Sequence, residues 1–395
     1  MIWQIFFWIC IGLMLHSYVL FPLILELFSR KKMENDIVYL SMEELPPLTL
    51  FMSAYNEEKV IRKKIESVMH CSYPKHLLKF FIGSDCSTDQ TVAIIRSFQA
   101  EYSNLILENF SVRSGKSSVL NKLVEMEKQN SAYDESIYVF TDANIIFAHD
   151  TLYQLAKHFK NPEIAVVGAN VLPLKRSSAG ISFQESSYIE RENRIKYQEG
   201  LIWGKMIGAF GACYAIRSRR FAPVPENFLM EDFFITMNAI ISGKNKSISN
   251  LKAICYEDIS EEISEEYKRK IRISAGNFQN LSRFWKLLFK PLTGLGFSFI
   301  SHKVIRWLGP FLILFSIISS GLVAGENNFY ATIFITQCVL LLMPLIDFIL
   351  KKQKIENVLL RFISYFYLMN FALLVGFLKF IKGIRTNVWQ PTKRV

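Results

Sequence analysis

Four long stretches without charged side chains constrain this chain most strongly. Residues 1–25 contain no Asp, Glu, Lys or Arg, and neither do residues 307–324, 329–346 and 362–378. About 20 apolar helical residues cross the hydrocarbon core of a bilayer, so each stretch reaches or approaches the length of a membrane-spanning helix. Buried helices of a large soluble domain are the alternative, but such helices rarely lack charge over so many turns. The sequence therefore predicts an integral membrane protein.

The first apolar stretch is predicted to remain as an anchor. It has no basic residues before it, its apolar run is too long for a secretory signal, and no small-residue cleavage site follows. Arg30, Lys31 and Lys32 come directly after it, which indicates a cytosolic flank under the positive-inside rule. We expect a protein of the cell (inner) membrane whose large polar region, about residues 33–286, lies in the cytosol.

The charge and the cysteines argue against two other classes of protein. The net charge is +11, but much of the excess lies beside the apolar stretches, where basic residues hold topology and meet anionic lipid head groups. No recognition motif for DNA or RNA is present, so no nucleic-acid partner is expected. None of the six cysteines has C-x-x-C spacing, which predicts neither a zinc site nor a disulfide framework.

Between the apolar stretches, short runs of β character alternate with helical patterns. The expected strands are residues 48–54, 80–83, 105–107 and 137–140, and the expected helices are residues 57–69, 88–98, 117–128 and 152–159. This alternation predicts an α/β domain with a parallel sheet covered by helices on both faces. In such sheets ligands bind outside the carboxyl ends of the strands.

Acidic side chains stand where that rule predicts a ligand site. Asp85 follows one expected strand, and Asp142 follows another in the run Asp142-Ala143-Asn144. Glu231 and Asp232 form a third acidic cluster farther along. Each cluster alone is typical of a turn or a helix cap. The three together in one α/β domain indicate a functional site.

This ordered set resembles the family-2 nucleotide-sugar glycosyltransferases of GT-A fold, in the membrane-integral branch with the cellulose, hyaluronan and poly-N-acetylglucosamine synthases. The resemblance covers about residues 45–290 and implies a Rossmann-like, mostly parallel sheet in a cytosolic domain, with interfacial helices and with transmembrane helices at both ends. The implied divisions are an N-terminal transmembrane helix at 1–28, a GT-A domain at 45–256, interfacial amphipathic helices at 257–302, transmembrane helices at 303–380 and a basic tail at 381–395.

The resemblance also implies a donor site. Its residues would be Ala54, Tyr55, Glu57, Asp85, Arg113, Lys116, Asp142, Arg269 and Arg272. Asp85 matches the aspartate that binds the nucleotide base, and a carboxylate accepts the imide N–H of uracil, so a UDP-sugar is expected. Arg113 or Lys116, followed by Asn121, would lie beside the donor diphosphate; a solvated loop charge is the alternative for either. Phe110 stands where a Walker motif needs glycine, so a P-loop is rejected.

Asp142 and Asn144 fall at the D-x-D position, which implies Mg²⁺ or Mn²⁺ as the cofactor. These cations are normally held by one or two carboxylates together with phosphate oxygens. Asn144 replaces the second acid and offers a carbonyl oxygen without charge. Metal binding is therefore expected to be weaker, or to depend more on Asp142 and the phosphates.

Asp232, beside Glu231, matches the catalytic base of the family. An inverting transfer needs a carboxylate that takes the proton from the acceptor hydroxyl. The alternative is an acidic pair that opens a helix and is favoured by the helix dipole. Gly211 and Ala212 resemble the loop that lines the acceptor side.

A later segment falls where the family carries Q-x-x-R-W. Arg272 holds the arginine position, whose planar guanidinium suits a pyrophosphate. Arg269 replaces the glutamine, and Ile273 replaces the tryptophan that normally offers a platform to an acceptor sugar. Processive polymerisation is therefore in doubt. Gln279 and Trp285 are candidate acceptor residues, or anchors of an amphipathic helix at the membrane interface.

The leading hypothesis is an inverting membrane glycosyltransferase that transfers a sugar from a nucleotide-sugar donor to a growing polysaccharide or glycolipid. One alternative is a non-processive transferase that adds a single sugar to a lipid-linked acceptor. Another is a non-catalytic subunit of a polysaccharide export complex, which would have partner subunits. Simple alternation of crossings sends the basic tail outside, but relatives often carry such a tail in the cytosol, where we expect it.

Overall fold

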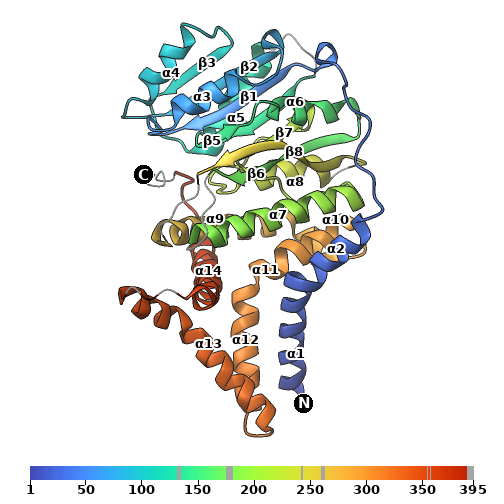
Figure 1. Ribbon diagram of the computed structural model, residues 1–395, viewed down its shortest axis with the longest axis vertical. Helices are drawn as coiled ribbons and strands as arrows, with labels where there is room; N and C mark the ends of the chain where they lie inside the picture. Colours follow the sequence, from blue (N-terminus) through green and yellow to red (C-terminus); the bar gives the residue numbers. More distant parts are fainter. Residues whose placement is uncertain are drawn as a thin grey trace. The chain divides into compact units, whose positions relative to one another are not determined.

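The computed structural model describes residues 1–130, 135–174, 181–241, 243–258, 263–353, 355 and 357–388, so residues 389–395 of the expected basic tail lie outside the described part. The chain forms two compact units. The helical unit consists of Met1–Leu27, Ser177–Glu185 and Ser260–Gly383, and the sheet unit consists of Phe28–Arg176, Ser186–Ile259 and Ile384–Val395. Each unit is described separately below, with the labels of Figure 1.

The sheet unit is built on one eight-stranded sheet with the order β3-β2-β1-β4-β7-β6-β8-β5. The strands are β1 Leu48–Ala54, β2 Leu78–Asp85, β3 Leu105–Phe110, β4 Ile137–Thr141, β5 Ile145–Phe147, β6 Ile164–Pro173, β7 Cys213–Arg217 and β8 Lys246–Glu257. The run β3-β2-β1-β4 and the pair β6-β8 are parallel, whereas β7 is antiparallel to β4 and β6, and β5 to β8. The predicted α/β class is confirmed. The alternation of strands and helices in the sequence did not predict the antiparallel strands β5 and β7.

Helices cover this sheet. They are α3 Ile61–Met69, α4 Thr91–Gln99, α5 Lys116–Asn130, α6 Thr151–Ala156, α7 Ile181–Trp203, whose first residues belong to the helical unit, and α8 Glu231–Ile241. The helix expected from residue 57 begins only at Ile61. In the segment before it, the Glu57 N–H donates to Thr91 Oγ1 (2.8 Å) and the Glu58 N–H donates to Asp89 Oδ2 (3.1 Å), which joins this segment to the beginning of α4.

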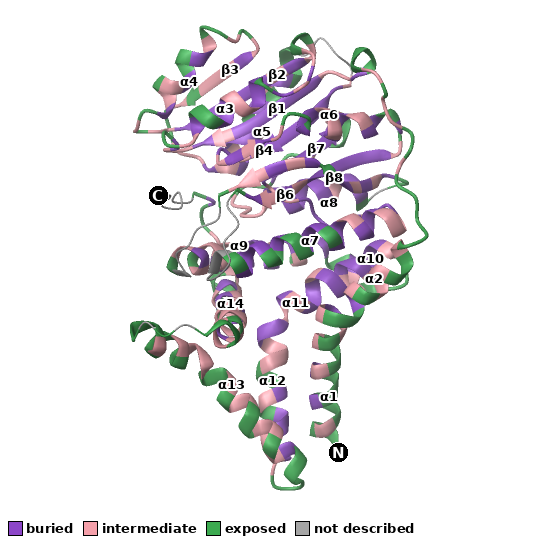
Figure 2. Cartoon of the chain, in the orientation of Figure 1, coloured by how far each residue is buried: buried purple, intermediate pink, exposed green. Residues whose placement is uncertain are grey.

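The sheet core is apolar on both faces, as expected of parallel strands under helices. Leu50 and Met52 of β1 are fully buried, and so is Phe51 on the opposite face. The Phe51 ring centroid lies 5.0 Å from Tyr138 and 5.5 Å from Phe140 of β4. Figure 2 shows the central strands as buried along most of their length. This packing fixes the strand ends that carry the polar loops.

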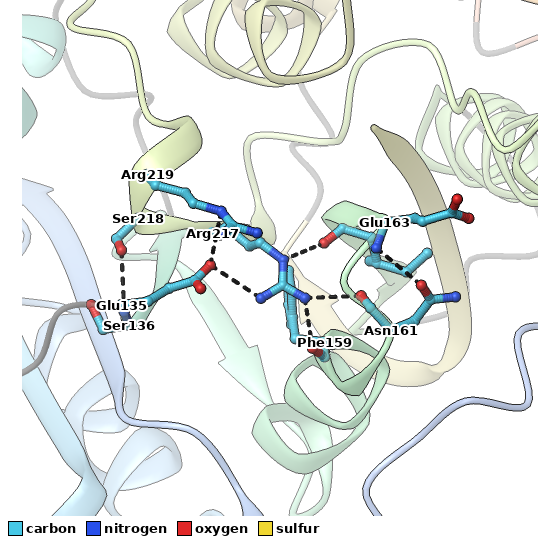
Figure 3. A network of polar contacts seen from close by, with 9 residues as sticks. Glu135, Ser136, Phe159, Asn161, Glu163, Arg217, Ser218 and Arg219 are labelled. Atoms are coloured by element: carbon cyan, nitrogen blue, oxygen red, sulfur yellow. Dashed lines mark hydrogen bonds and ion pairs between the residues drawn. The ribbon is translucent and has the colours of Figure 1, made fainter. Parts of the chain in front are cut away.

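The edge of the sheet away from those ends is held by Arg217, the last residue of β7 (Figure 3). Arg217 pairs with Ile137, the first residue of β4. Its guanidinium donates to the carbonyl oxygens of Ile164 (2.8 Å), Phe159 (2.6 Å) and Asn161 (2.9 Å), and also to the Glu135 carboxylate. A single buried side chain thus donates to three carbonyl groups, of which that of Asn161 also accepts the Ile164 N–H (3.1 Å).

We predict that Arg217→Met lowers the free energy of unfolding by about 3 kcal/mol, because it leaves buried carbonyl groups and an acidic partner unsatisfied. Arg219→Met is the control. Arg219 is half-exposed and contacts only the shared Glu135 within this network, so its change should stay within about 0.5 kcal/mol. Thermal unfolding in detergent measures both, and equal effects of the two variants would contradict this role of Arg217.

The helical unit is built from helices of different length and polarity. They are α1 Ile2–Leu15, continued through a π-helical turn at His16–Leu20 into α2 Phe21–Ser29, then the charged α9 Ile263–Phe284, the 3-10 turn Trp285–Phe289, α10 Gly294–Ser298, the π-helical turn Phe299–Val304, α11 Ile305–Trp307, α12 Gly309–Leu322, α13 Asn328–Lys352 and α14 Val358–Ile381. Among the described residues, three helices are long and apolar enough to cross a membrane: Ile2–Ser29, α13 and α14. The pair Gly294–Trp307 and Gly309–Leu322, bent by 64°, is a fourth if it forms one span.

The exposure of these helices supports a lipid environment. Ile335, Leu342 and Phe348 on α13 are more than half exposed, and Figure 2 colours much of this helix as exposed. Rows of exposed apolar side chains are unfavourable in water. In a bilayer the same side chains meet acyl chains, and that cost disappears.

Candidate active site

The first wall of the site is a pair of loops that follow β1 and β2 and are bonded to each other. Asn56 has a φ of +52°, a left-handed conformation that Asn tolerates better than most residues. Its N–H donates to Ser87 Oγ (3.2 Å), and its side-chain oxygen accepts from the Thr88 N–H (2.8 Å). Of the predicted donor residues, Ala54 ends β1, and Tyr55 and Glu57 lie on the loop that follows, which is held firmly at the carboxyl edge of the sheet.

Asp85, the last residue of β2, organises a second loop. Its carboxylate is buried and accepts the backbone N–H groups of Ser114 (2.7 Å) and Gly115 (2.9 Å). Gly115 has a φ of +83°, where a side chain would be strained. A carboxylate has about four lone-pair positions, so these bonds leave capacity for the N–H of a base, the role that the sequence predicted.

Two of the predicted donor residues are stacked. The Arg113 guanidinium carbon lies 3.4 Å from the centroid of the Tyr55 ring. A cation over an aromatic face is attracted electrostatically and also by contact. This stack joins the loop after β1 to the loop after β3, the two chain segments that the sequence assigned to the donor.

Lys116, the first residue of α5, lies at the centre of the site. Its Nζ is 2.5 Å from Asp142 Oδ1 and 2.5 Å from Glu231 Oε1, so one ammonium joins two acids that are 89 residues apart. Burial lowers the pKa of Lys116, but the two carboxylates together raise that pKa above its usual value. The ammonium is therefore positively charged and neutralises a pair of acids that would otherwise repel each other.

Asp232 lies in the first turn of α8 against a glycine loop. Its Oδ1 accepts the Phe233 N–H (2.8 Å), and a methyl group at Gly211 would lie 2.9 Å from Oδ2, so a larger residue there would displace the carboxylate. Burial raises the pKa of Asp232 to about 6, with a further contribution from Glu231, whereas Lys116 and Lys196 act in the opposite direction. Such a carboxylate can accept a proton near neutral pH.

The loop that the sequence assigned to the acceptor is joined directly to the segment that it assigned to the donor. The Ala212 carbonyl oxygen accepts the Thr141 hydroxyl (2.8 Å) and the Asp142 N–H (3.3 Å). Asp142, Lys116, Glu231, Gly211 and Asp232 thus form one connected cluster. Residues from β4, α5, α8 and the loop before β7 meet at a single place.

A comparison with known protein families identifies the family of this chain. Residues 49–222 match the model of Glycosyl transferase family 2, and residues 139–378 match that of Glycosyl transferase family group 2. The chain belongs to glycosyltransferase family 2. The predicted family and its enzyme class are thereby confirmed.

Relatives of this glycosyltransferase include "Probable glycosyltransferase YdaM" of Bacillus subtilis (strain 168), which is 26% identical over 314 residues, 73% of this chain and 68% of the relative. "Beta-monoglucosyldiacylglycerol synthase" of Nostoc sp. is 30% identical over 125 residues, 31% of this chain and 25% of the relative. Among solved structures, a mannosyltransferase from Pyrobaculum calidifontis, in complex with GDP-Man and Mn²⁺, has a TM-score of 0.69 at 18% identity and covers 95% of this chain and 99% of its own. The last likeness is one of fold, in agreement with the predicted GT-A architecture.

The acidic groups of this glycosyltransferase can contribute only part of a metal site. In the described part of the chain, no group of three or more His, Cys, Asp or Glu side chains is arranged to hold an ion alone. Asp142 is 38% exposed, and Asn144 beyond it is half-buried. These donors fit a hard cation that takes one or two protein oxygens and completes its shell with substrate phosphates.

The other predicted residues lie in the helical unit, on α9 or directly after it. Arg269 lies 3.4 Å from Glu266 and 3.8 Å from Glu185, in an ion-pair cluster that also holds Lys270. Arg272 and Gln279 are half-buried on the same helix, and Trp285, the residue after it, is 49% exposed. The roles of these four residues at the donor and acceptor remain predictions.

Three residues near the enzyme's site make contacts that the sequence did not predict. Asn121, expected beside the diphosphate, forms two hydrogen bonds with the backbone of Val224 and so ties α5 to the segment before α8. Thr141 was not named, and neither was Lys64, which stands among the apolar positions Ile61, Ile65 and Val68 of α3. A lysine in an apolar helix stripe was the available signal, because burying an ammonium is costly unless it has a partner.

Proposed function

We propose that this enzyme is an inverting transferase that uses a nucleotide-sugar, with a UDP-sugar as the expected donor. The observation that carries the proposal is the position of Asp232, a buried carboxylate of raised pKa in the same cluster as Asp142 and Lys116. In this role Asp232 takes the proton of the acceptor hydroxyl while that oxygen attacks the anomeric carbon. The nucleoside diphosphate leaves from the opposite face, on the side of Asp142.

The donor interactions follow from the two loops. Asp85 accepts the N–H of the base, and the Tyr55–Arg113 stack borders the nucleotide. Asp142 and Asn144 would hold Mg²⁺ or Mn²⁺ together with the phosphates, a proposal supported by the P. calidifontis mannosyltransferase solved with GDP-Man and Mn²⁺. When bound, the cation neutralises charge that develops on the leaving diphosphate. Arg272 is proposed to contact the pyrophosphate from α9.

For the acceptor, we favour a lipid-linked or glycolipid molecule that receives one sugar. Two observations support this choice: a glucosyldiacylglycerol synthase is among the relatives, and Ile273 stands where processive relatives carry tryptophan. Gly211 and Ala212 then line the acceptor side, with Gln279 and Trp285 as further contacts. Extension of a polysaccharide is the second candidate, and the length of the product separates the two.

The decisive experiment measures release of nucleoside diphosphate by the detergent-purified enzyme. UDP-, GDP- and dTDP-sugars are offered in turn with Mg²⁺ or Mn²⁺, and membrane lipid extract serves as acceptor. We expect release from one UDP-sugar that depends on the divalent ion and on the extract. Release from a GDP-sugar only would correct the donor, and no release from any donor would contradict the proposed reaction.

The pH dependence of kcat/KM should follow the protonation of the Asp232 carboxyl. Since burial raises the pKa of this carboxyl to about 6, the base is protonated and inactive below that pH, and kcat/KM should rise as the pH increases through about 6. Lys196→Met should move this limb to higher pH, because the Lys196 charge lowers the pKa of Asp232. Rates between pH 5 and 8 measure both; a limb near pH 4 in either enzyme would contradict the assignment.

We also propose that the catalytic sheet and the C-terminal tail both lie in the cytosol. α14 runs along the charged helix α9: Ser274 Oγ donates to the Leu373 carbonyl (2.7 Å), and the Phe278 ring lies 4.8 Å from Phe377. Because α9 is charged, we infer that α14, packed along it, lies at the membrane interface and does not cross. The bent helix pair ending in α12, together with α13, then supplies two crossings, which returns the tail to the side of the sheet.

The sidedness can be checked with sealed inverted membrane vesicles. Protease should remove a C-terminal tag from outside these vesicles, whereas a tag placed in the loop at Glu326, between α12 and α13, should be protected until detergent is added. Protection of the C-terminal tag would contradict the interfacial position of α14.

A further inference from the structure

Lys64 is a buried cation that the proposed reaction does not use. It lies on α3 in the sheet unit, and its side chain has no solvent exposure. The Nζ donates to Thr141 Oγ1 (2.8 Å) and lies 3.6 Å from the centroid of the Phe147 ring. Lysine is almost never fully buried without a partner, so its place beneath the end of β4 needs a reason.

The three thiols that interact electrostatically with Lys64 do not neutralise its charge. Cys71, Cys213 and Cys255 are its polarisable neighbours, and burial raises the pKa of Cys71 to about 11 and that of Cys213 to about 12. These thiols are therefore neutral at the pH of the cytosol. Burial lowers the pKa of Lys64 itself to about 8, while the charge of Asp142 acts in the opposite direction.

The hydrogen bonds around Thr141 have a defined direction. An ammonium group can only donate, so Thr141 Oγ1 must accept from Lys64. The single hydroxyl hydrogen of Thr141 is then available for the Ala212 carbonyl (2.8 Å), which also accepts the Asp142 N–H. Ala212 follows Gly211, and the Asp232 carboxylate lies directly against Gly211, because a Cβ added there would stand 2.9 Å from Oδ2. One chain of contacts thus runs from Lys64 to both functional carboxylates.

We propose that Lys64 is a positioning residue: through Thr141 and the Ala212 carbonyl it fixes the spacing between the donor carboxylate Asp142 and the base Asp232. This proposal rests on the proposed function of those two carboxylates. Transfer requires that the acceptor oxygen and the anomeric carbon each deviate by no more than a fraction of an ångström from the positions in which they react. A buried cation beneath the junction of β4 and the glycine loop supplies such rigidity without touching the substrate.

The test compares Lys64→Met, Thr141→Val and the double variant. Lys64→Met removes the charge at similar volume and should fold, but its kcat should fall about 10- to 100-fold with little change in the donor KM. Thr141→Val leaves the buried ammonium without its hydroxyl partner and should lower the Tm. The double variant replaces both partners with apolar groups, so it should recover the Tm but keep the low kcat.

Amide hydrogen exchange gives a readout that needs no substrate. In Lys64→Met, the peptide containing Asp142 should exchange at least tenfold faster, because the Ala212 carbonyl is no longer held in place. Lys63→Met is the matched control: Lys63 is the exposed neighbour on the same helix, and its variant should match the wild type in kcat, Tm and exchange.

Unchanged exchange and a wild-type kcat in Lys64→Met would overturn the proposal. So would a double variant that regains kcat together with Tm, because Lys64 would then serve stability alone. Absence of turnover in the wild-type enzyme would count against the proposed function only, since the exchange measurement still tests the link from Lys64 to Asp142.

Discussion

Replacement of Asp232 by Asn is expected to lower kcat by about 10²- to 10⁴-fold, the usual contribution of a general base. The amide has nearly the same shape, and it can still accept the Phe233 N–H and pack on Gly211. It cannot take a proton from the acceptor hydroxyl. Binding of the nucleotide should therefore be retained while transfer is lost, and the measurement is kcat beside the Kd for UDP with Mn²⁺.

Asp150→Asn is the matched control for this variant. Asp150 also stands at the beginning of a helix, α6, but its side chain is 63% exposed and lies outside the cluster. Its variant should keep the wild-type kcat. If Asp232→Asn also kept the wild-type kcat, Asp232 would only be an acid at the beginning of α8, where the helix dipole favours negative charge. Another residue would then be the base, with Glu231 as the first candidate.

Replacement of Lys116 by Met is expected to impair both stability and activity. The ammonium joins Asp142 and Glu231 at 2.5 Å each, and the Glu231 side chain is only 8% exposed. Removing one partner of a buried ion pair leaves an uncompensated charge, which costs about 3 kcal/mol. We expect that loss of unfolding free energy, together with a fall in kcat/KM of about 10²-fold or more, since a cation near a developing negative charge is lost.

Lys122→Met separates these effects from a general loss of charge. Lys122 lies on the same helix α5 and is exposed, so its variant should match the wild type in both measurements. Adding Glu231→Gln to Lys116→Met should restore part of the stability, because the unpaired acid is removed, but should not restore kcat/KM. Full activity in Lys116→Met would show that the ammonium serves only to neutralise the two acids.

Much of the architecture could be predicted because it depends on local patterns. A helix of charge-free residues has few favourable environments other than a bilayer, so α13 and the N-terminal span were visible as composition. Short apolar runs alternating with amphipathic segments specify strands and covering helices, which located β1, β2, β3 and β4. Acids that follow such strands come together because parallel strands end at one edge of the sheet.

Other parts depend on contacts between distant segments, for which the sequence carries no local signal. The antiparallel strands β7 and β5 fall after irregular segments, so alternation could not orient them. The packing of α14 on α9 involves two helices about 100 residues apart, and the proposal that α14 lies at the membrane interface rests on that contact.

The sequence by itself predicted the membrane helices and the α/β class, since composition and periodicity follow from the nearest neighbours in the chain, and its resemblance to a family supplied the candidate acidic residues. Only the tertiary structure decided which charges meet: Lys116 with Asp142 and Glu231, and Lys64 with Thr141. The strength of such pairs depends on separations of a few ångströms and on burial. Both quantities arise when the chain is packed, and neither is encoded in the spacing of residues.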